Sequence, residues 1–250
     1  MADAALRKSA EECTSERAAA LEAQYGHLSA EEVLKIAITE VFEGQIALVS
    51  SFGADSSVML NMISDIAPDL PVVFLDTGKH FGETRRYGKV LEEKLGLTNV
   101  QTVLPDADRL AELDKGGFLF STNHDLCCHI RKTEPLERAL EPFAASITGR
   151  KRFQNSARDR LPVFEADGTR IKVNPLASWS FEDLVDYREQ HDLPAHPLVE
   201  QGFLSIGCMP CTSPVEPGED QRAGRWRGTG KTECGIHIKT PKGETFIRRD

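Results

Sequence analysis

The sequence predicts an α/β fold with a doubly wound, mostly parallel sheet, and two features of the chain indicate it. Short, continuously apolar runs occur at 45–50 and 71–76, as expected for strands buried on both faces of a parallel sheet. Each run leads through a Gly-containing loop into a segment with helical periodicity. Five strand-like runs alternating with helices fit right-handed crossovers within one sheet.

The other elements follow in chain order. Residues 1–44 read as an N-terminal helical segment, in which a capping box at 29–32 begins a helix that ends near Gly44. A helix from Glu83 to Leu95 is stopped by Gly96, and a third strand is expected at 100–104. Further elements are a helix beginning at 133–137, a strand ending at 146–148 and a capped helix from 180.

The composition and net charge argue against some classes of binding partner. The chain has 250 residues, 40% of them hydrophobic, and a net charge of −9, which argues against nucleic acid or an anionic membrane as partner. No apolar run approaches the roughly 20 residues of a membrane helix, and no signal-peptide core is seen, so we expect a cytoplasmic protein. Six cysteines in a reducing compartment indicate metal binding or catalysis rather than a disulfide framework.

Four of these cysteines form two pairs, Cys127-Cys128 and Cys208-x-x-Cys211. Adjacent side chains diverge in helices and strands, so the first pair is expected in a bend just ahead of the helix at 133–137. An iron–sulfur cluster suits four such thiolates. Zinc, which favours Cys-x-x-Cys on both sides of its site, is an alternative, as are a disulfide and inert buried thiols.

The loops at 51–56 and 76–78 follow buried strands. Such loops meet at the carboxyl edge of a parallel sheet, where backbone N–H groups and a helix N-terminus form an anion site. The first loop is neither a Walker A sequence nor a Gly-x-Gly-x-x-Gly fingerprint. Taken alone, it could equally be a turn that only connects two elements.

From about residue 45 onwards the chain resembles the assimilatory adenylyl-sulfate reductases, thioredoxin-dependent relatives of the PP-loop adenosine-nucleotide hydrolases. The motifs that carry the resemblance are Ser51-Phe52-Gly53-Ala54-Asp55-Ser56, Leu75-Asp76-Thr77-Gly78, the two cysteine pairs with Lys132, 218–225, and Glu233-Cys234-Gly235-Ile236-His237. The resemblance implies a [4Fe–4S] cluster on Cys127, Cys128, Cys208 and Cys211. It also implies a nucleotide bound by the PP-loop and a nucleophilic Cys234.

We therefore expect Cys234 to attack the sulfur of adenylyl sulfate, with His237 and nearby cations lowering the pKa of its thiol. Lys132 could also link the charge of the cluster to the substrate. The residues expected to bind substrate are Ser51, Gly53, Asp55, Ser56, Asp76, Thr77, Gly78, Lys132, Gly149, Arg152, Arg222 and Arg225. Two departures from the family pattern are Lys151, which lacks the planar fork of Arg, and Phe52, where the broader PP-loop pattern has Gly.

The predicted organisation is an N-terminal helical segment at 1–44, a PP-loop domain at 45–212 and a flexible tail at 213–250 that carries Cys234. The expected reductant is thioredoxin or glutaredoxin, and a homo-oligomer is possible. The nearest alternative is a 3′-phosphoadenylyl-sulfate reductase, or one that accepts both substrates. A PP-loop sulfurtransferase and a non-enzymatic iron–sulfur redox sensor are more distant alternatives.

Overall fold

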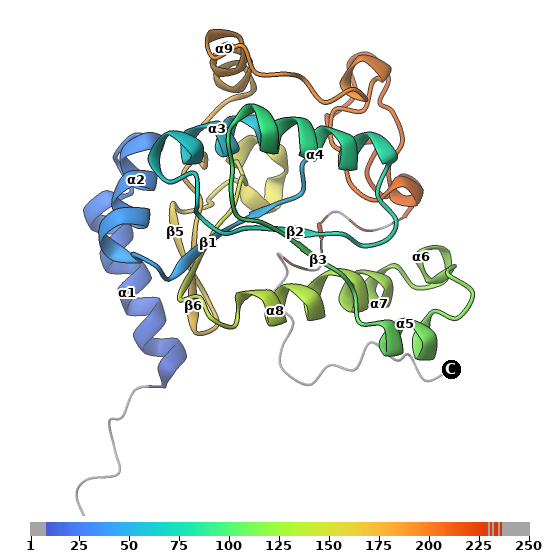
Figure 1. Ribbon diagram of the computed structural model, residues 1–250, viewed down its shortest axis with the longest axis horizontal. Helices are drawn as coiled ribbons and strands as arrows, with labels where there is room; N and C mark the ends of the chain where they lie inside the picture. Colours follow the sequence, from blue (N-terminus) through green and yellow to red (C-terminus); the bar gives the residue numbers. More distant parts are fainter. Residues whose placement is uncertain (1–8, 230, 232, 235, 237–250) are drawn as a thin grey trace, which may run out of the picture.

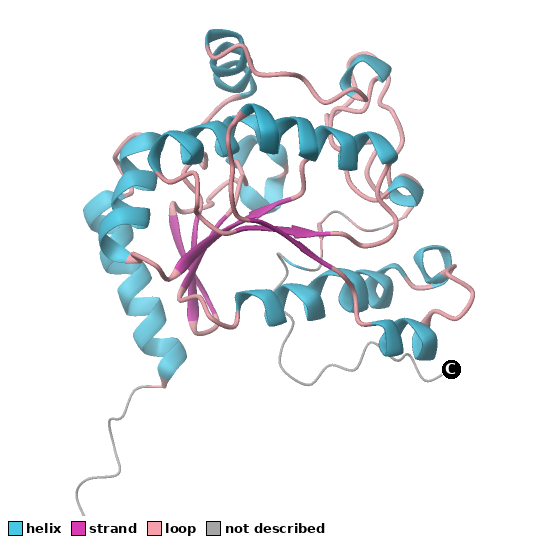
Figure 2. Ribbon diagram, viewed as in Figure 1, coloured by secondary structure: helices cyan, strands magenta, loops and turns pink. Residues whose placement is uncertain are grey.

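The computed structural model describes residues 9–229, 231, 233, 234 and 236, and these form a six-stranded sheet with helices on both faces (Figures 1 and 2). The strands are β1 Ile46–Ser50, β2 Val72–Leu75, β3 Val100–Val103, β4 Ala145–Ile147, β5 Phe164–Asp167 and β6 Arg170–Val173. The α-helices are α1 Ala10–Tyr25, α2 Ala30–Ile36, α3 Ser56–Ile66, α4 Gly82–Lys94, α5 Ala107–Leu113, α6 Leu119–Thr122, α7 His124–Cys128, α8 Glu134–Leu140 and α9 Phe181–Gln190. π-Helical turns cover Ala37–Val41 and His129–Thr133.

The strand order is β3-β2-β1-β4-β6-β5, and every neighbouring pair is parallel except β5 with β6. The predicted doubly wound, mostly parallel α/β fold is confirmed. β1 and β2 are almost wholly buried because neighbours flank them on both sides. β3 is at an edge, and its side chains are accordingly half-buried or exposed.

One part of the sheet departs from the predicted alternation of strands with helices. β5 and β6 form an antiparallel hairpin, with Asp167 opposite Arg170 and Gly168 at φ +62° in the turn. A hairpin needs only a short turn between its strands, whereas a parallel pair needs a crossover. α1, on the N-terminal side of the chain, packs beside β5, and its Glu22 Oε2 accepts a hydrogen bond from Phe164 N.

Side-chain alternation along the strands gives the sheet two apolar faces. On the α3 and α4 side, Leu48 and Phe74 join a large buried core with Leu60, Ile63 and Leu91. On the other side, a second buried cluster combines Ala47, Val73, Leu75, Leu136 and Leu140, so that α8 lies against β2 and β3 (Figure 1). The two layers fix the carboxyl ends of β1, β2 and β4, which is where the predicted ligand loops begin.

In the part of the chain that the structure describes, no helix is both long and apolar enough to cross a membrane.

Candidate active site

The loop after β1 lines a cavity at the carboxyl edge of the sheet. Ser51, Gly53, Asp55 and Ser56 all contribute to its wall, as the sequence predicted. The loop turns directly into α3, whose N-terminal N–H groups provide partial positive charge. Asp55 is not free to cap that helix through its side chain, because its Oδ2 accepts a hydrogen bond from the buried Lys151 Nζ at 2.8 Å.

Phe52 stands where the broader PP-loop pattern has Gly, and the structure shows how the loop accommodates its side chain. Its backbone lies in the left-handed region, with φ +47°, and its ring is buried and packed edge-to-face against Phe74 at 5.1 Å. A Cβ on Gly88 of α4 would come within 3.2 Å of that ring, so the absence of a side chain there makes room for it. Phe52 thus keeps the turn that Gly would adopt and anchors the loop in the core.

Replacing Phe52 tests both the strain of its left-handed backbone and the contribution of its buried ring to stability. We expect Phe52→Ala to lower the free energy of unfolding by about 3–4 kcal/mol through the cavity it leaves. Phe52→Gly leaves the same cavity but removes the left-handed strain, so it should be about 1 kcal/mol more stable than Phe52→Ala. Urea unfolding followed by circular dichroism measures both values, and equal stability of the two variants would contradict the strain.

The loop after β2 lies elsewhere than expected. Asp76, Thr77 and Gly78 do not line the cavity; Leu75 and His80 on either side of them do. Asp76 accepts from Gly78 N and Arg85 Nη2, each at 3.0 Å. The Thr77 hydroxyl lies 3.2 Å from Cys208 Sγ, so this loop supports the cysteines instead of facing the PP-loop cavity.

The four paired cysteines come together from distant parts of the chain. The charges of Cys208 and Cys211 act on the thiol of Cys127, whose pKa is raised by burial to about 11. All six cysteines of the chain are free, so the structure contains no disulfide. Among the residues it describes, no three His, Cys, Asp or Glu side chains are arranged to hold a single metal ion.

The expected bend at Cys127-Cys128 is wrong. The two cysteines end α7, and the π-helical turn His129–Thr133 continues the chain into α8 without leaving helical geometry. Such a wider turn changes the direction of following side chains without breaking the helix. The buried Arg131 fixes this segment by donating to Thr77 O at 2.8 Å and pairing with Asp114 at 2.5 Å.

Cys234 and Lys132 meet at the wall of the same cavity. Lys132 Nζ lies 3.7 Å from Cys234 Sγ, and Cys128 also donates a hydrogen bond to that sulfur. These two contacts, the Cys128 bond above all, hold the pKa of Cys234 well below its ordinary value although burial opposes them. Burial works to lower the pKa of Lys132, but the sulfurs of Cys208, Cys234 and Cys128 outweigh it and raise that pKa.

Arg222 and Arg225 also line the cavity, together with Gly149. Arg225 stacks on Trp226 at 4.4 Å and lies so close to Gly207 that a Cβ there would meet its guanidinium. Its buried Nε has no hydrogen-bond partner among the described residues. A buried cation with an unused donor suits an anionic ligand.

Arg152, predicted to bind substrate, does not line the cavity. Its Nε donates to Leu161 O at 2.9 Å, whereas Arg150 and Lys151 of the same basic loop face the cavity. Arg152 begins the 3-10 turn Arg152–Gln154, where its side chain leaves the cavity, and the sequence did not reveal this. His237, the other predicted catalytic neighbour, is outside the described residues.

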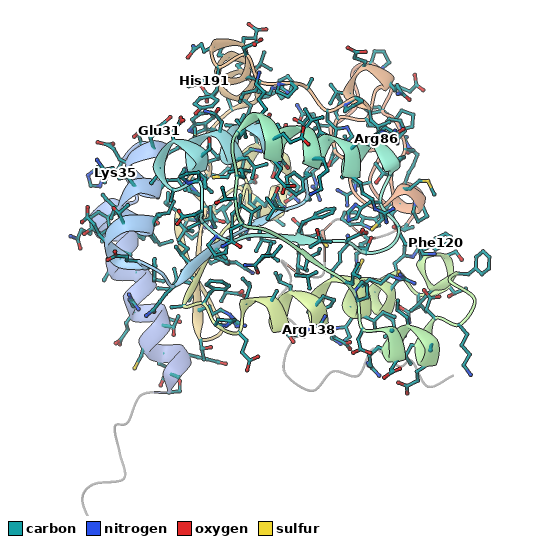
Figure 3. All side chains as sticks on the ribbon, in the orientation of Figure 1. Glu31, Lys35, Arg86, Phe120, Arg138 and His191 are labelled. Carbon is teal, nitrogen blue, oxygen red and sulfur yellow. The ribbon has the colours of Figure 1, made fainter. Side chains whose placement is uncertain are left out.

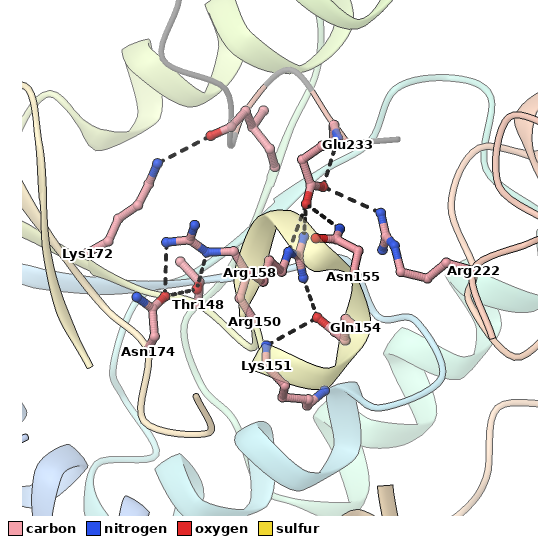
Figure 4. A network of polar contacts seen from close by, with 12 residues as sticks. Thr148, Arg150, Lys151, Gln154, Asn155, Arg158, Lys172, Asn174, Arg222 and Glu233 are labelled. Atoms are coloured by element: carbon pink, nitrogen blue, oxygen red, sulfur yellow. Dashed lines mark hydrogen bonds and ion pairs between the residues drawn. The ribbon is translucent and has the colours of Figure 1, made fainter. Parts of the chain in front are cut away.

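Two cations of the cavity, Arg158 and Lys172, were not predicted from the sequence. Arg158 and Glu233 both line the cavity and form an ion pair of 2.7 Å, at the centre of the polar network in Figure 4. Lys172 of β6 reaches the same space, where its Nζ donates to Ile236 O at 3.3 Å. The Glu233-Cys234 motif drew attention to this region, but nothing in the sequence singled out Arg158 or Lys172.

The described part of the predicted flexible tail lies against the cysteine loop. Ser213 N donates to Gly224 O at 2.9 Å, Trp226 N donates to Cys211 O at 3.0 Å, and Trp226 is buried. A Cβ on Gly224 would overlap Ser213 O, so only Gly permits this close approach. These contacts hold the segment up to Trp226 against the cysteine loop, and the mobility of the tail stays a prediction.

The fold and the site together define a class of protein. An anion-binding loop at the carboxyl edge of a parallel sheet, ringed by cations, is typical of nucleotide-binding α/β proteins. A cysteine with a depressed pKa at its wall adds a candidate nucleophile.

Comparison with known proteins specifies the class further. Residues 45–214 match the phosphoadenosine phosphosulfate reductase domain, and the chain belongs to that family. It is 54% identical to an adenosine 5′-phosphosulfate reductase of Mesorhizobium japonicum, over 92% of this chain and 90% of that one. A phosphoadenosine 5′-phosphosulfate reductase of Gloeobacter violaceus is 41% identical, over 86% and 90% of the two chains.

A solved structure agrees with this assignment. The phosphoadenylyl-sulfate reductase of Candida auris, in a phosphate complex, superposes with a TM-score of 0.67 at 28% identity. The match covers 80% of this chain and 97% of that chain.

Proposed function

We propose that the protein is an adenosine 5′-phosphosulfate (adenylyl sulfate) reductase, which forms sulfite and AMP at the expense of a thiol reductant. The observation that supports this most strongly is Cys234 beside Lys132 in the cavity that the PP-loop lines. The relative from Mesorhizobium japonicum carries the same activity in its name.

The first step is transfer of a sulfonate group to Cys234. Its thiolate attacks the sulfur of adenylyl sulfate, an S–S bond forms, and the S–O bond to the phosphate breaks. The bonding electron pair leaves with the phosphate oxygen, so AMP is released and Cys234 becomes an S-sulfocysteine. Lys132, whose Nζ lies 3.7 Å from the Cys234 sulfur, favours the thiolate that makes this attack.

The second step returns the enzyme to its thiol form. A reductant thiolate attacks the Cys234 sulfur, sulfite leaves with the S–S electron pair, and a mixed disulfide forms. A second thiol of the reductant then releases Cys234 and closes the reductant's own disulfide. Two electrons thus pass from a dithiol protein, thioredoxin or glutaredoxin, to the sulfur that leaves as sulfite.

The cavity supplies charge for the anionic substrate. The PP-loop and the N-terminus of α3 suit a phosphate, and Lys132, Arg222 and Arg225 bring positive charge near Cys234. The unpaired Nε of Arg225 is the donor most in need of an anion. Arg150 and Lys151 line the cavity, whereas Arg152 does not. Their charges are paired with Glu165 and Asp55.

The four paired cysteines would hold a [4Fe–4S] cluster. Such a cluster uses one thiolate for each iron, so four thiols near one another fit it even where no three of the described side chains converge on one ion. Bound there, the cluster would supply a local charge beside Lys132 and a staple between α7 and the 208–211 loop. Six free thiols also favour a reducing, cytoplasmic location.

One experiment tests the proposal. Purified, reduced protein is incubated anaerobically with adenylyl sulfate and no reductant, and its intact mass is then measured. We expect one added sulfonate, released as sulfite when thioredoxin is supplied. No added mass would overturn the proposed function, and a gain only with the 3′-phosphorylated nucleotide would assign the protein to the phosphoadenylyl-sulfate reductases instead.

A further inference from the structure

The carboxylate of Glu233 is held by three side chains from two parts of the chain. Its Oε2 accepts from Arg158 Nε at 2.8 Å and from Asn155 Nδ2 at 3.1 Å, and Arg158 Nη2 lies 2.7 Å away. Its Oε1 lies 3.4 Å from Arg222 Nη2. Figure 4 shows the carboxylate between these groups, with Arg158 and Asn155 on the loop after β4 and Arg222 on the C-terminal segment.

These groups are desolvated. The side chain of Glu233 is 11% exposed and that of Arg158 is 7% exposed. Burial works to raise the pKa of Glu233, but the charge of Arg158 outweighs it and holds that pKa below its ordinary value. Removing one partner of such a buried pair leaves an uncompensated charge, so breaking this contact costs far more than breaking a surface ion pair.

The same carboxylate is tied to the nucleophile. Glu233 Oε1 accepts the backbone N–H of Cys234 at 2.8 Å, and Cys234 is the next residue in the chain. Arg158 is buried in the loop after β4, where it also donates to Gln154 Oε1. The position of Cys234 over the cavity is therefore set through Glu233 by a loop 75 residues earlier in the chain.

We propose that Glu233 is a positioning residue, the latch that holds Cys234 against Lys132 during sulfonate transfer. The inference rests on the proposed function and assigns Glu233, Arg158 and Asn155 a role within it. With the latch closed, Cys234 is buried and directed into the cavity. With the latch open, Cys234 is accessible to a protein thiol, so the latch serves the first chemical step and not the second.

Two measurements on Glu233→Gln separate these steps. The amide keeps the size of the side chain but loses its charge. We expect single-turnover sulfonation of Cys234 by adenylyl sulfate to slow by about tenfold to a hundredfold. Sulfite release from Cys234 that has already been sulfonated should be at least as fast as in the wild type when thioredoxin is added.

Alkylation of the substrate-free protein gives a readout independent of activity. We expect iodoacetamide to modify Cys234 of Glu233→Gln about tenfold faster than in the wild type, because the latch no longer shields it. Cys13 is exposed on α1 and serves as the internal reference in each digest. General unfolding would also speed the modification of the other buried cysteines, which should stay unchanged.

A matched variant controls for the loss of a carboxylate in the same segment. Glu219 pairs with Arg227 at 2.7 Å, but both side chains are well exposed, so Glu219→Gln should leave every rate unchanged. The latch is refuted if wild type is sulfonated while Glu233→Gln matches it in both sulfonation and alkylation. Failure of the wild type to accept a sulfonate would instead refute the proposed function.

Discussion

Cys234→Ser should lose sulfite formation from adenylyl sulfate by at least about a thousandfold, the largest effect that we expect from any single substitution. A serine hydroxyl is not ionised at neutral pH, and a sulfate ester formed on it could not be opened by a thiol. The measurement is release of AMP and of sulfite in the presence of thioredoxin, together with the intact mass after incubation with adenylyl sulfate alone.

Cys13→Ser is the matched control, since Cys13 is an exposed thiol on α1 far along the chain from the cavity residues. It should keep full activity and still gain one sulfonate. If Cys234→Ser released sulfite at a rate near that of the wild type, another thiol would be the nucleophile, and the role assigned to Lys132 would fall with it.

The sheet could be predicted because each of its central strands carries its own signal. Continuous apolar runs at β1 and β2, each followed by a loop and an apolar-faced helix, define parallel strands whatever the rest of the chain does. The hairpin of β5 and β6 lacked such runs, because charged residues interrupt the apolar ones in both strands. Its place in the sheet follows from packing against α1, which no local pattern encodes.

The sequence predicted the cavity residues that belong to recognisable motifs. Motif residues of the PP-loop, Lys132, Arg222, Arg225 and Cys234 all line one cavity. The sequence could not predict which way each side chain of the basic loop points. Arg150 and Lys151 face the cavity, whereas Arg152 Nε donates to Leu161 O. The ion pair of Arg158 with Glu233 joins residues 75 positions apart, and only the tertiary structure brings them together.

The local geometry predicted for the cysteine pair was wrong, and the cluster that it was expected to hold stays a prediction. Adjacent cysteines seemed to need a bend to reach one centre, yet Cys127 and Cys128 lie at the end of α7, directly before a π-helical turn. The π-helical turn lets the chain pass from α7 into α8 without the expected bend. Cys208 and Cys211 lie close enough for their charges to act on Cys127, and the Thr77 hydroxyl contacts Cys208 Sγ.

Lys132→Met should slow sulfonation of Cys234 by about a hundredfold or more, the second largest expected effect. Lys132 Nζ is a cation close to the Cys234 sulfur, and in the proposed enzyme Cys128 is engaged as a cluster ligand, which leaves Lys132 as the charge that stabilises the thiolate. Met keeps the length and apolar stem of Lys, so the loss reports on charge. Single-turnover sulfonation, followed by quenching and intact mass, measures it.

Lys172→Met distinguishes that local effect from a general loss of positive charge in the cavity. Lys172 lines the same cavity, but its Nζ pairs with Asp167 at 2.9 Å and contacts Ile236 O instead of the cysteine sulfur. The Asp167 carboxylate offsets the positive charge of Lys172. Removal of that charge should therefore slow sulfonation by less than about tenfold. If both variants lost the same sulfonation rate, only the total positive charge of the cavity would matter. The 3.7 Å contact of Lys132 with Cys234 would then have no specific role in the attack.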